Sequence, residues 1–134
     1  MTRLFNTLAG LTAAAVMGLT PMAAFADTQL GMYQTEDRLE DYQVSLCGAG
    51  DKFLCVKLLA LRGKAYSDRA GKLIGTNIVD QAKPSGTNRW KGKITIEGKT
   101  ADSTLTLRQG VALDVHACAY VVLCASISLP AAKK

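Results

Sequence analysis

The sequence predicts a small all-β domain folded as an antiparallel up-and-down barrel of about eight strands with two disulfides. Short runs of alternating apolar and polar residues recur, clusters of Gly, Asp, Asn and Ser separate them, and the four cysteines form two closely spaced pairs. Alternation with period two is typical of strands that bury one face, and the clusters are typical of turns. A barrel is favoured over an open sheet because closure removes unpaired strand edges.

The clearest predicted strand runs from Arg89 to Glu97. Its apolar face carries Trp90, Gly92, Ile94 and Ile96, and its opposite face carries Arg89, Lys91, Lys93, Thr95 and Glu97. One face therefore meets a core and the other meets water. Shorter runs predict further strands at 32–36, 42–46, 53–61, 73–79, 105–107, 113–117 and 121–129. Helical periodicity is not evident after the first 26 residues.

Each pair of cysteines flanks a predicted turn. Cys47 and Cys55 lie on either side of a Gly-Ala-Gly-Asp turn, and Cys118 and Cys124 end the facing strands of the last hairpin. Local pairing, Cys47 with Cys55 and Cys118 with Cys124, is favoured because the turns bring these residues together. Four cysteines allow three pairings, and the other two, which require distant strands to meet, stay open because the sequence alone does not choose among them.

The first 26 residues predict a cleaved export signal, followed by a single barrel domain at 27–134. Arg3 provides a positive start, an uncharged apolar run follows, and Ala24-Phe25-Ala26 offers small residues at the cleavage point. The alternative is an uncleaved membrane anchor, which Gly18, Thr20 and Pro21 disfavour. We therefore expect a periplasmic or secreted protein, soluble after cleavage near Ala26 and not membrane-spanning. An even number of cysteines fits such an oxidising compartment.

The charge is mildly basic, with 16 Lys and Arg against 11 Asp and Glu. Such an excess commonly serves solubility, although it also suits an anionic envelope component such as a lipid headgroup or a cell-wall polymer. No run of basic residues is interleaved with aromatic ones, so no nucleic-acid partner is expected.

No catalytic constellation is predicted. Asp114, His116 and Cys118 share one face of a predicted strand, which resembles a metal or nucleophile site, but a disulfide would occupy Cys118 and the sequence has one histidine. We therefore expect no metal, no cofactor and no catalytic residue, and an enzyme is the least favoured class. The acidic pairs Glu36-Asp37 and Glu40-Asp41 are interpreted as a solvated loop rather than glycosidase carboxylates.

Nearly all of the chain after residue 26 resembles a family of exported bacterial proteins that is described only as a domain of unknown function. The matching stretches are Gly31-Met32-Tyr33, Cys47-Gly48 with Leu54-Cys55, Gly71-Lys72 followed by Leu73-Ile74-Gly75, Trp90-Lys91-Gly92, and Ala117-Cys118 with Leu123-Cys124. The resemblance implies a calycin-like or lipocalin-like barrel and transfers no site residues. The sequence departs from the family at Tyr33, Lys91 and Ala117, and it lacks the family's closing Trp-x-Arg after Cys124.

Two functional hypotheses follow. The first is a non-enzymatic binding protein that carries one small apolar ligand inside the barrel. The walls of that site would be Trp90, Ile94, Ile96, Leu105, Leu107, Leu113 and Val115. The alternative is an envelope structural or interaction protein with a filled interior, which would use Arg89, Lys91 and Lys93 against an anionic polymer, a lipid headgroup or a protein. Trp90 could stack on such a ligand, but a lone inward tryptophan in a barrel is more often a core plug.

Overall fold

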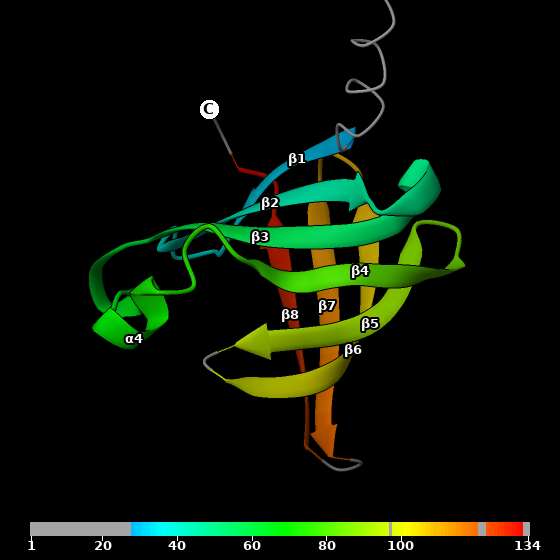
Figure 1. Ribbon diagram of the computed structural model, residues 1–134. Coiled ribbons are helices and arrows are strands. Elements are labelled where there is room, and N and C mark those ends of the chain that lie inside the picture. Colours follow the sequence, from blue (N-terminus) through cyan, green and yellow to red (C-terminus); the bar gives the residue numbers. More distant parts are fainter. Residues whose placement is uncertain (1–27, 97, 121–122, 133–134) are drawn as a thin grey trace, which may run out of the picture.

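One continuous antiparallel sheet of eight strands, paired in chain order from β1 to β8, makes up the fold (Figure 1). The computed structural model describes residues 28–96, 98–120 and 123–132, without the side chains of Ile96 and Tyr120. The predicted export signal at 1–26 lies outside these residues. The strands are β1 (Thr28–Gln34), β2 (Glu40–Cys47), β3 (Phe53–Leu61), β4 (Asn77–Gly86), β5 (Arg89–Ile96), β6 (Lys99–Arg108), β7 (Ala112–Tyr120) and β8 (Leu123–Pro130).

The predicted all-β up-and-down fold is confirmed, and the sheet curls into a half-barrel that closes at one end. β2, β3 and β4 run across the upper parts of β7 and β8, whose far ends extend beyond them (Figure 1). Among the described residues, β1 meets the chain just after β8 at one bridge, Tyr33 with Ala131, next to a hydrogen bond of 2.9 Å from Ala132 N to Met32 O. The opposite end of the curled sheet has no such bridge in the described part.

One strand begins later than its sequence predicts. The run 73–79 was expected as a strand, but β4 begins at Asn77 and continues through Pro84 to Gly86. Residues 73–76 form a turn in which Thr76 N donates to Leu73 O at 2.9 Å and Gly75 N to Leu58 O at 2.7 Å. Leu73 still packs against the core, and so its apolar character serves a turn rather than a strand.

Three short helical segments connect the strands: η1 (Ala49–Asp51), η2 (Gly63–Ala65) and α4 (Asp68–Gly71). The first is the predicted turn between β2 and β3. α4 was not predicted because one turn of helix is too short to produce a periodic apolar pattern. It begins after Ser67, whose hydroxyl accepts a hydrogen bond of 3.0 Å from Ala70 N, as a helix N-cap does.

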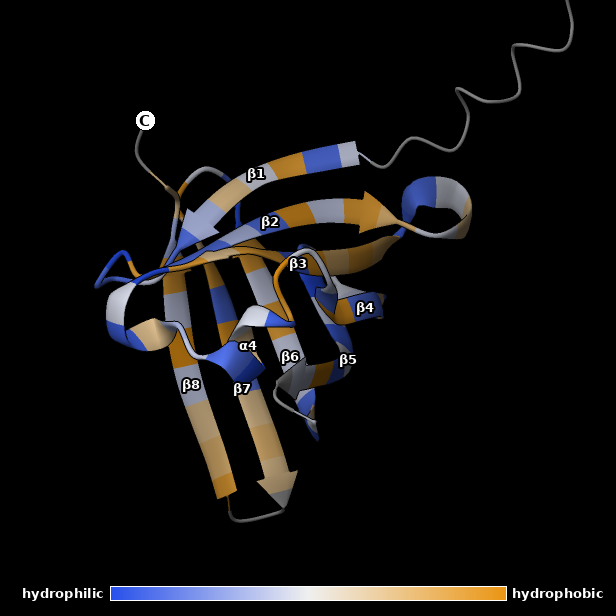
Figure 2. Ribbon diagram, turned by 60° about the vertical axis from the view of Figure 1, so that its left-hand side comes forward, coloured by the Kyte–Doolittle hydropathy of each residue, from blue (hydrophilic) through white to orange (hydrophobic). Residues whose placement is uncertain are grey.

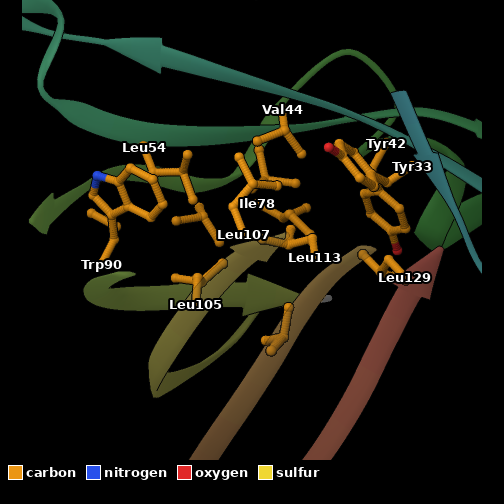
Figure 3. Close-up of a cluster of buried hydrophobic side chains, with 14 of the residues drawn as sticks. Tyr33, Tyr42, Val44, Leu54, Ile78, Trp90, Leu105, Leu107, Leu113 and Leu129 are labelled. Atoms are coloured by element: carbon orange, nitrogen blue, oxygen red, sulfur yellow. The ribbon is translucent and has the colours of Figure 1, made fainter. Parts of the chain in front are cut away.

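The core lies between the crossing halves of the sheet (Figure 3). Its fully buried members include Tyr33, Val44, Leu54, Val56, Val79, Leu105 and Leu113. Trp90 lies beside Leu54 at one end of this cluster, 8% exposed, and its indole Nε1 donates to Lys52 O at 3.0 Å. The indole is thus buried with its polar atom satisfied, as expected of a core plug.

Both disulfides form within hairpins, which confirms the favoured pairing. Cys47 bonds to Cys55 between β2 and β3, and Cys118 bonds to Cys124 between β7 and β8. Cys47 and Cys55 are each 4% exposed, whereas Cys118 is half-buried and Cys124 is exposed. The first bond therefore lies inside the protein and the second lies at its surface.

Candidate ligand-binding groove

The inward-facing side chains of β7 and β8 become smaller toward the open end of the half-barrel. Along β7 they change from Leu113 to Val115 and then to alanines, and along β8 they change from Leu129 through Ile127 to Ala125. Figure 2 shows the hydrophobic bands of both strands continuing along the part that no other strand covers. A methyl group fills far less space than a leucine side chain, so this half of the sheet presents an apolar hollow.

This hollow is a groove of about 420 Å³, which we call the mouth groove. It is lined by Arg69, Ile94, Lys99, Thr100, Ala101, Val115, Ala117, Ala119, Ala125 and Ile127. A second, inner cavity of about 120 Å³ shares Ile94, Val115 and Ile127 with the groove and continues inward. The two together resemble a small-ligand site in size and in apolar character.

Two cations, Arg69 and Lys99, lie at the rim of the mouth groove, and the described residues of its lining include no carboxylate. Arg69 and Lys99 are both exposed. Arg69 comes from α4, which the Ser67 cap holds in place, and Lys99 begins β6. The rim is therefore positive while the floor is apolar.

The inner cavity has a polar wall formed by Tyr42 and Glu40. The Tyr42 hydroxyl donates a hydrogen bond to Glu40 Oε1. Burial, and then the hydrogen bond to Glu40, raise the pKa of Tyr42 far above its usual value. The hydroxyl therefore stays protonated at any physiological pH and keeps its hydrogen bond to Glu40.

Asp41, next to Glu40, has a structural role outside the groove. Its carboxylate accepts hydrogen bonds from both Arg62 Nη atoms, at 3.0 and 2.5 Å, and from Gln34 Nε2 at 2.7 Å. The hydrogen bonds from Arg62 hold the pKa of Asp41 below its usual value. The solvated-loop interpretation is confirmed for Glu36 and Asp37, which are exposed in a turn. It is wrong for Glu40 and Asp41, which lie in β2, where Glu40 is half-buried against the inner cavity and Asp41 is buried.

The structure distributes the seven predicted wall residues over different places. Ile94 and Val115 line both the mouth groove and the inner cavity, and Leu105 lines the inner cavity. Trp90, Leu107 and Leu113 lie in the core, and the side chain of Ile96 is outside the described part. The sequence reasoning missed Ile127, Arg69, Lys99 and the alanines. The decrease in side-chain size along 113–119 and 129–125 was the available signal.

The outer face of the sheet carries the predicted basic stripe. Arg89, Lys91 and Lys93 are all exposed, and Lys93 Nζ lies 2.5 Å from Asp102 Oδ1. Both partners of this ion pair are largely in water, where such pairs contribute little to stability. Whether the stripe meets an anionic envelope component stays a prediction.

The curled, antiparallel, eight-stranded sheet has a lipocalin-like fold. A solved structure titled "Protein HP1028 from the human pathogen Helicobacter pylori belongs to the lipocalin family" is similar, with a TM-score of 0.52 over 78% of this chain and 82% of that chain. The two sequences are 16% identical, so the likeness concerns the fold alone. No protein-family model and no curated protein matches the chain, so the resemblance to the exported family stays a prediction.

Within the part of the chain that the structure describes, no helix is long and apolar enough to cross a bilayer.

Proposed function

We propose that this protein binds one small amphipathic molecule, with an apolar chain in the mouth groove and an anionic head at its rim. The observation that carries the proposal is the apolar floor of Ile94, Val115 and Ile127, which the mouth groove and the inner cavity share, below the rim cations Arg69 and Lys99. A lipocalin-like fold supports a binding role.

The apolar floor predicts a dependence of affinity on chain length. Each buried methylene contributes about 0.8 kcal/mol, which corresponds to about fourfold in affinity. We therefore expect the dissociation constant to fall about fourfold per added methylene between octanoate and longer saturated carboxylates, until the groove is filled. Isothermal titration calorimetry measures this series directly, and a flat series would contradict an apolar chain in the groove.

The rim predicts a preference for an anionic head. Exposed charge pairs are each worth about 0.2–1 kcal/mol, so Arg69 and Lys99 together favour dodecanoate over dodecanol by roughly fivefold. Replacing both with glutamine should remove this preference and leave dodecanol binding unchanged. Lys91→Gln is the control because Lys91 is also exposed but lies on the outer face. A preference that survives the double substitution would contradict the assignment of the head to the rim.

A substitution that fills the mouth groove tests whether the ligand binds there. Ala125→Phe puts a bulky side chain on the floor and should abolish binding of dodecanoate, while Thr95→Phe puts the same side chain on the exposed outer face and should not. Both variants are compared by circular dichroism to establish that they fold. Wild-type affinity in Ala125→Phe would overturn the proposal. Trp90 emission is a poor reporter because the indole is buried away from the groove.

We also infer that the protein acts outside the cytoplasm, as a periplasmic or secreted protein. The Arg3 start, the apolar run up to Ala26 and two disulfides support this. Fractionation of cells followed by N-terminal sequencing should find a chain that begins at Asp27. A full-length chain recovered from the cytoplasm would contradict it.

A further inference from the structure

The outer face of the β7–β8 hairpin gathers four side chains that the mouth groove does not use. His116 and Cys118 are two residues apart on β7 and point away from the core. On β8, Ser126 lies opposite His116 and Cys124 lies opposite Cys118. Strand pairing therefore places one imidazole, one hydroxyl and two sulfurs on the same surface.

These groups lie within reach of one another. The ligating atoms of His116, Cys118 and Cys124 are all within 4.8 Å of each other, and His116 Nε2 is 3.5 Å from Cys118 Sγ. The other ring nitrogen, His116 Nδ1, is 2.7 Å from Ser126 Oγ. The tautomer with its proton on Nδ1 donates to Ser126 and leaves the lone pair of Nε2 facing the sulfurs.

Access and surroundings distinguish the two disulfides of the protein. A thiol reduces a disulfide by direct attack on one sulfur, so the reaction requires access to that sulfur. Cys47 and Cys55 are each 4% exposed, whereas Cys124 is exposed.

We propose that Cys118–Cys124 is a reversibly reduced disulfide whose dithiol binds one Zn²⁺ together with His116 Nε2. A low-molecular-weight thiolate attacks Cys124 Sγ, the bond between the two cysteine sulfurs breaks, and Cys118 leaves as a thiolate. A second thiol resolves the mixed disulfide. In total, two thiols are oxidised to one external disulfide, and two electrons and two protons reach the cysteine pair. Zinc then displaces these two protons from the sulfurs.

The donor set suits zinc. Zn²⁺ binds thiolate sulfur at about 2.3 Å and imidazole nitrogen at about 2.0 Å in tetrahedral sites, so its ligands lie within roughly 4 Å of each other. Three protein ligands leave the fourth position to water. Ser126 is a positioning residue, because a hydrogen bond to the second ring nitrogen fixes the tautomer of a metal-binding histidine. The site lies on the opposite face from the mouth groove and is independent of the function proposed there.

Selective reduction is tested first, on the folded protein in glutathione redox buffers of increasing reducing strength. Thiols are trapped by alkylation and located by peptide mass spectrometry. We expect Cys118 and Cys124 to be alkylated while Cys47 and Cys55 remain bonded and the near-ultraviolet circular dichroism persists. Reduction of Cys47–Cys55 first, joint reduction of both pairs, or loss of the native spectrum would each overturn the proposal.

Zinc binding is tested next, on the oxidised and the selectively reduced protein, with a chromogenic chelator as competitor. The reduced protein should bind one equivalent of Zn²⁺ and the oxidised protein none. His116→Ala should weaken binding at least tenfold and Ser126→Ala about tenfold. Ser128→Ala is the matched control, because Ser128 donates to Asp114 on the same face rather than to His116. Equal binding by oxidised and reduced protein, or by wild type and His116→Ala, would overturn the site.

A spectroscopic readout separates positioning by Ser126 from a structural effect. Co²⁺ in the reduced protein should give thiolate charge-transfer absorption and the strong visible bands of a tetrahedral ion. Ser126→Ala should shift these bands, and Ser126→Thr, which keeps the hydroxyl, should restore them. Weak octahedral bands in the wild type would show that the sulfurs and the imidazole do not share one ion, and would overturn the proposal.

Discussion

At the residue scale, Gly92 determines how closely β4 and β5 approach. A Cβ atom added at Gly92 would lie 2.8 Å from Ala82 Cβ and 2.9 Å from Ala82 Cα, and so the backbone would have to move. We expect Gly92→Ala to destabilise the protein by about 1–3 kcal/mol, as overpacked cores do. Thermal unfolding measures the loss.

Gly86→Ala is the matched control for this substitution. The nearest atom to a Cβ added at Gly86 is Arg89 Cβ, at an ordinary contact distance of 3.8 Å. This variant should unfold at the wild-type temperature or slightly above it. Equal losses in the two variants would refute the close approach of β4 and β5 as the cause.

Asp41 makes the stability of the protein depend on pH. Because its hydrogen bonds from Arg62 lower the pKa of the folded carboxyl, the pair contributes stability above the unfolded pKa of about 4 and loses it as the pH falls through the lower folded value. Asp41→Asn should therefore unfold more readily than wild type at pH 7, and the difference should shrink below about pH 4. Denaturant unfolding at several pH values measures it.

Asp102→Asn is the control for the effect of pH, because Asp102 forms its ion pair with Lys93 in water. Its stability should follow the wild type at every pH. A difference between wild type and Asp41→Asn that stays constant from pH 7 to pH 3 would show that the Asp41 charge is not responsible.

The sequence predicted the orientation of some side chains correctly but did not predict the burial of Asp41, and the reason is physical. The inward orientation of Trp90 and the outward orientation of Lys91 and Lys93 follow from alternation along one strand, which is local. The burial of Asp41 depends on Arg62, which is 21 residues further along the chain and lies just after β3. Pattern within a single strand contains no information on such a partner.

At the scale of elements, the β7–β8 hairpin consists of a covered half and an uncovered half. Leu113 and Leu129 are buried under the other strands, whereas Ile127 is 51% exposed and Leu123 is 59% exposed. Backbone amides at 116–119 and 124–127 should therefore exchange hydrogen faster than those at 112–115, because no second layer protects them. Hydrogen exchange with mass spectrometry measures this.

The ligand should change the exchange of this hairpin. Dodecanoate in the mouth groove covers the uncovered half, so exchange at 116–119 and 124–127 should slow in wild type and remain fast in Ala125→Phe. Uniform protection along β7 without ligand would contradict the division of the hairpin into two halves. If dodecanoate slowed hydrogen exchange in both wild type and Ala125→Phe, it would bind outside the mouth groove.

The positions of the elements were largely predictable, and their exact limits were not. Most strands produced a two-residue period, and each cysteine pair marked a hairpin, because both signals are local in sequence. The exceptions are β1, which was expected at 32–36 and spans Thr28–Gln34, and β4. The late start of β4 and the helix α4 depend on hydrogen bonds with β3 and on the Ser67 cap. Since α4 supplies Arg69, the positive rim could not be predicted without the structure.

At the scale of the whole molecule, the half-barrel is open because, among the residues that the structure describes, β1 meets the chain just after β8 at a single bridge, Tyr33 with Ala131. The predicted barrel of eight strands was correct in topology, but the degree of closure depends on the stagger between strands, which alternation does not specify. This open end exposes the mouth groove. A fully closed barrel with the same side chains would cover Ala117 and Ala125.

Binding in the mouth groove should raise the stability of the whole molecule. A ligand that binds only the folded state at 100 times its dissociation constant adds about 2.7 kcal/mol. For a domain of about 100 residues this corresponds to an increase of Tm on the order of 10 °C. Differential scanning calorimetry with dodecanoate, below its micelle concentration, measures the increase.

The same measurement distinguishes a groove ligand from surface adsorption. Ala125→Phe should unfold at one temperature with and without dodecanoate, because the bulky ring occupies the groove, whereas Thr95→Phe should respond as wild type does. A ligand adsorbed on the basic outer face, at Arg89, Lys91 and Lys93, would instead raise Tm equally in all three proteins and lose its effect in high salt. That result would favour the alternative hypothesis of a protein that acts through its outer surface, because only a site in the groove is sensitive to the size of residue 125.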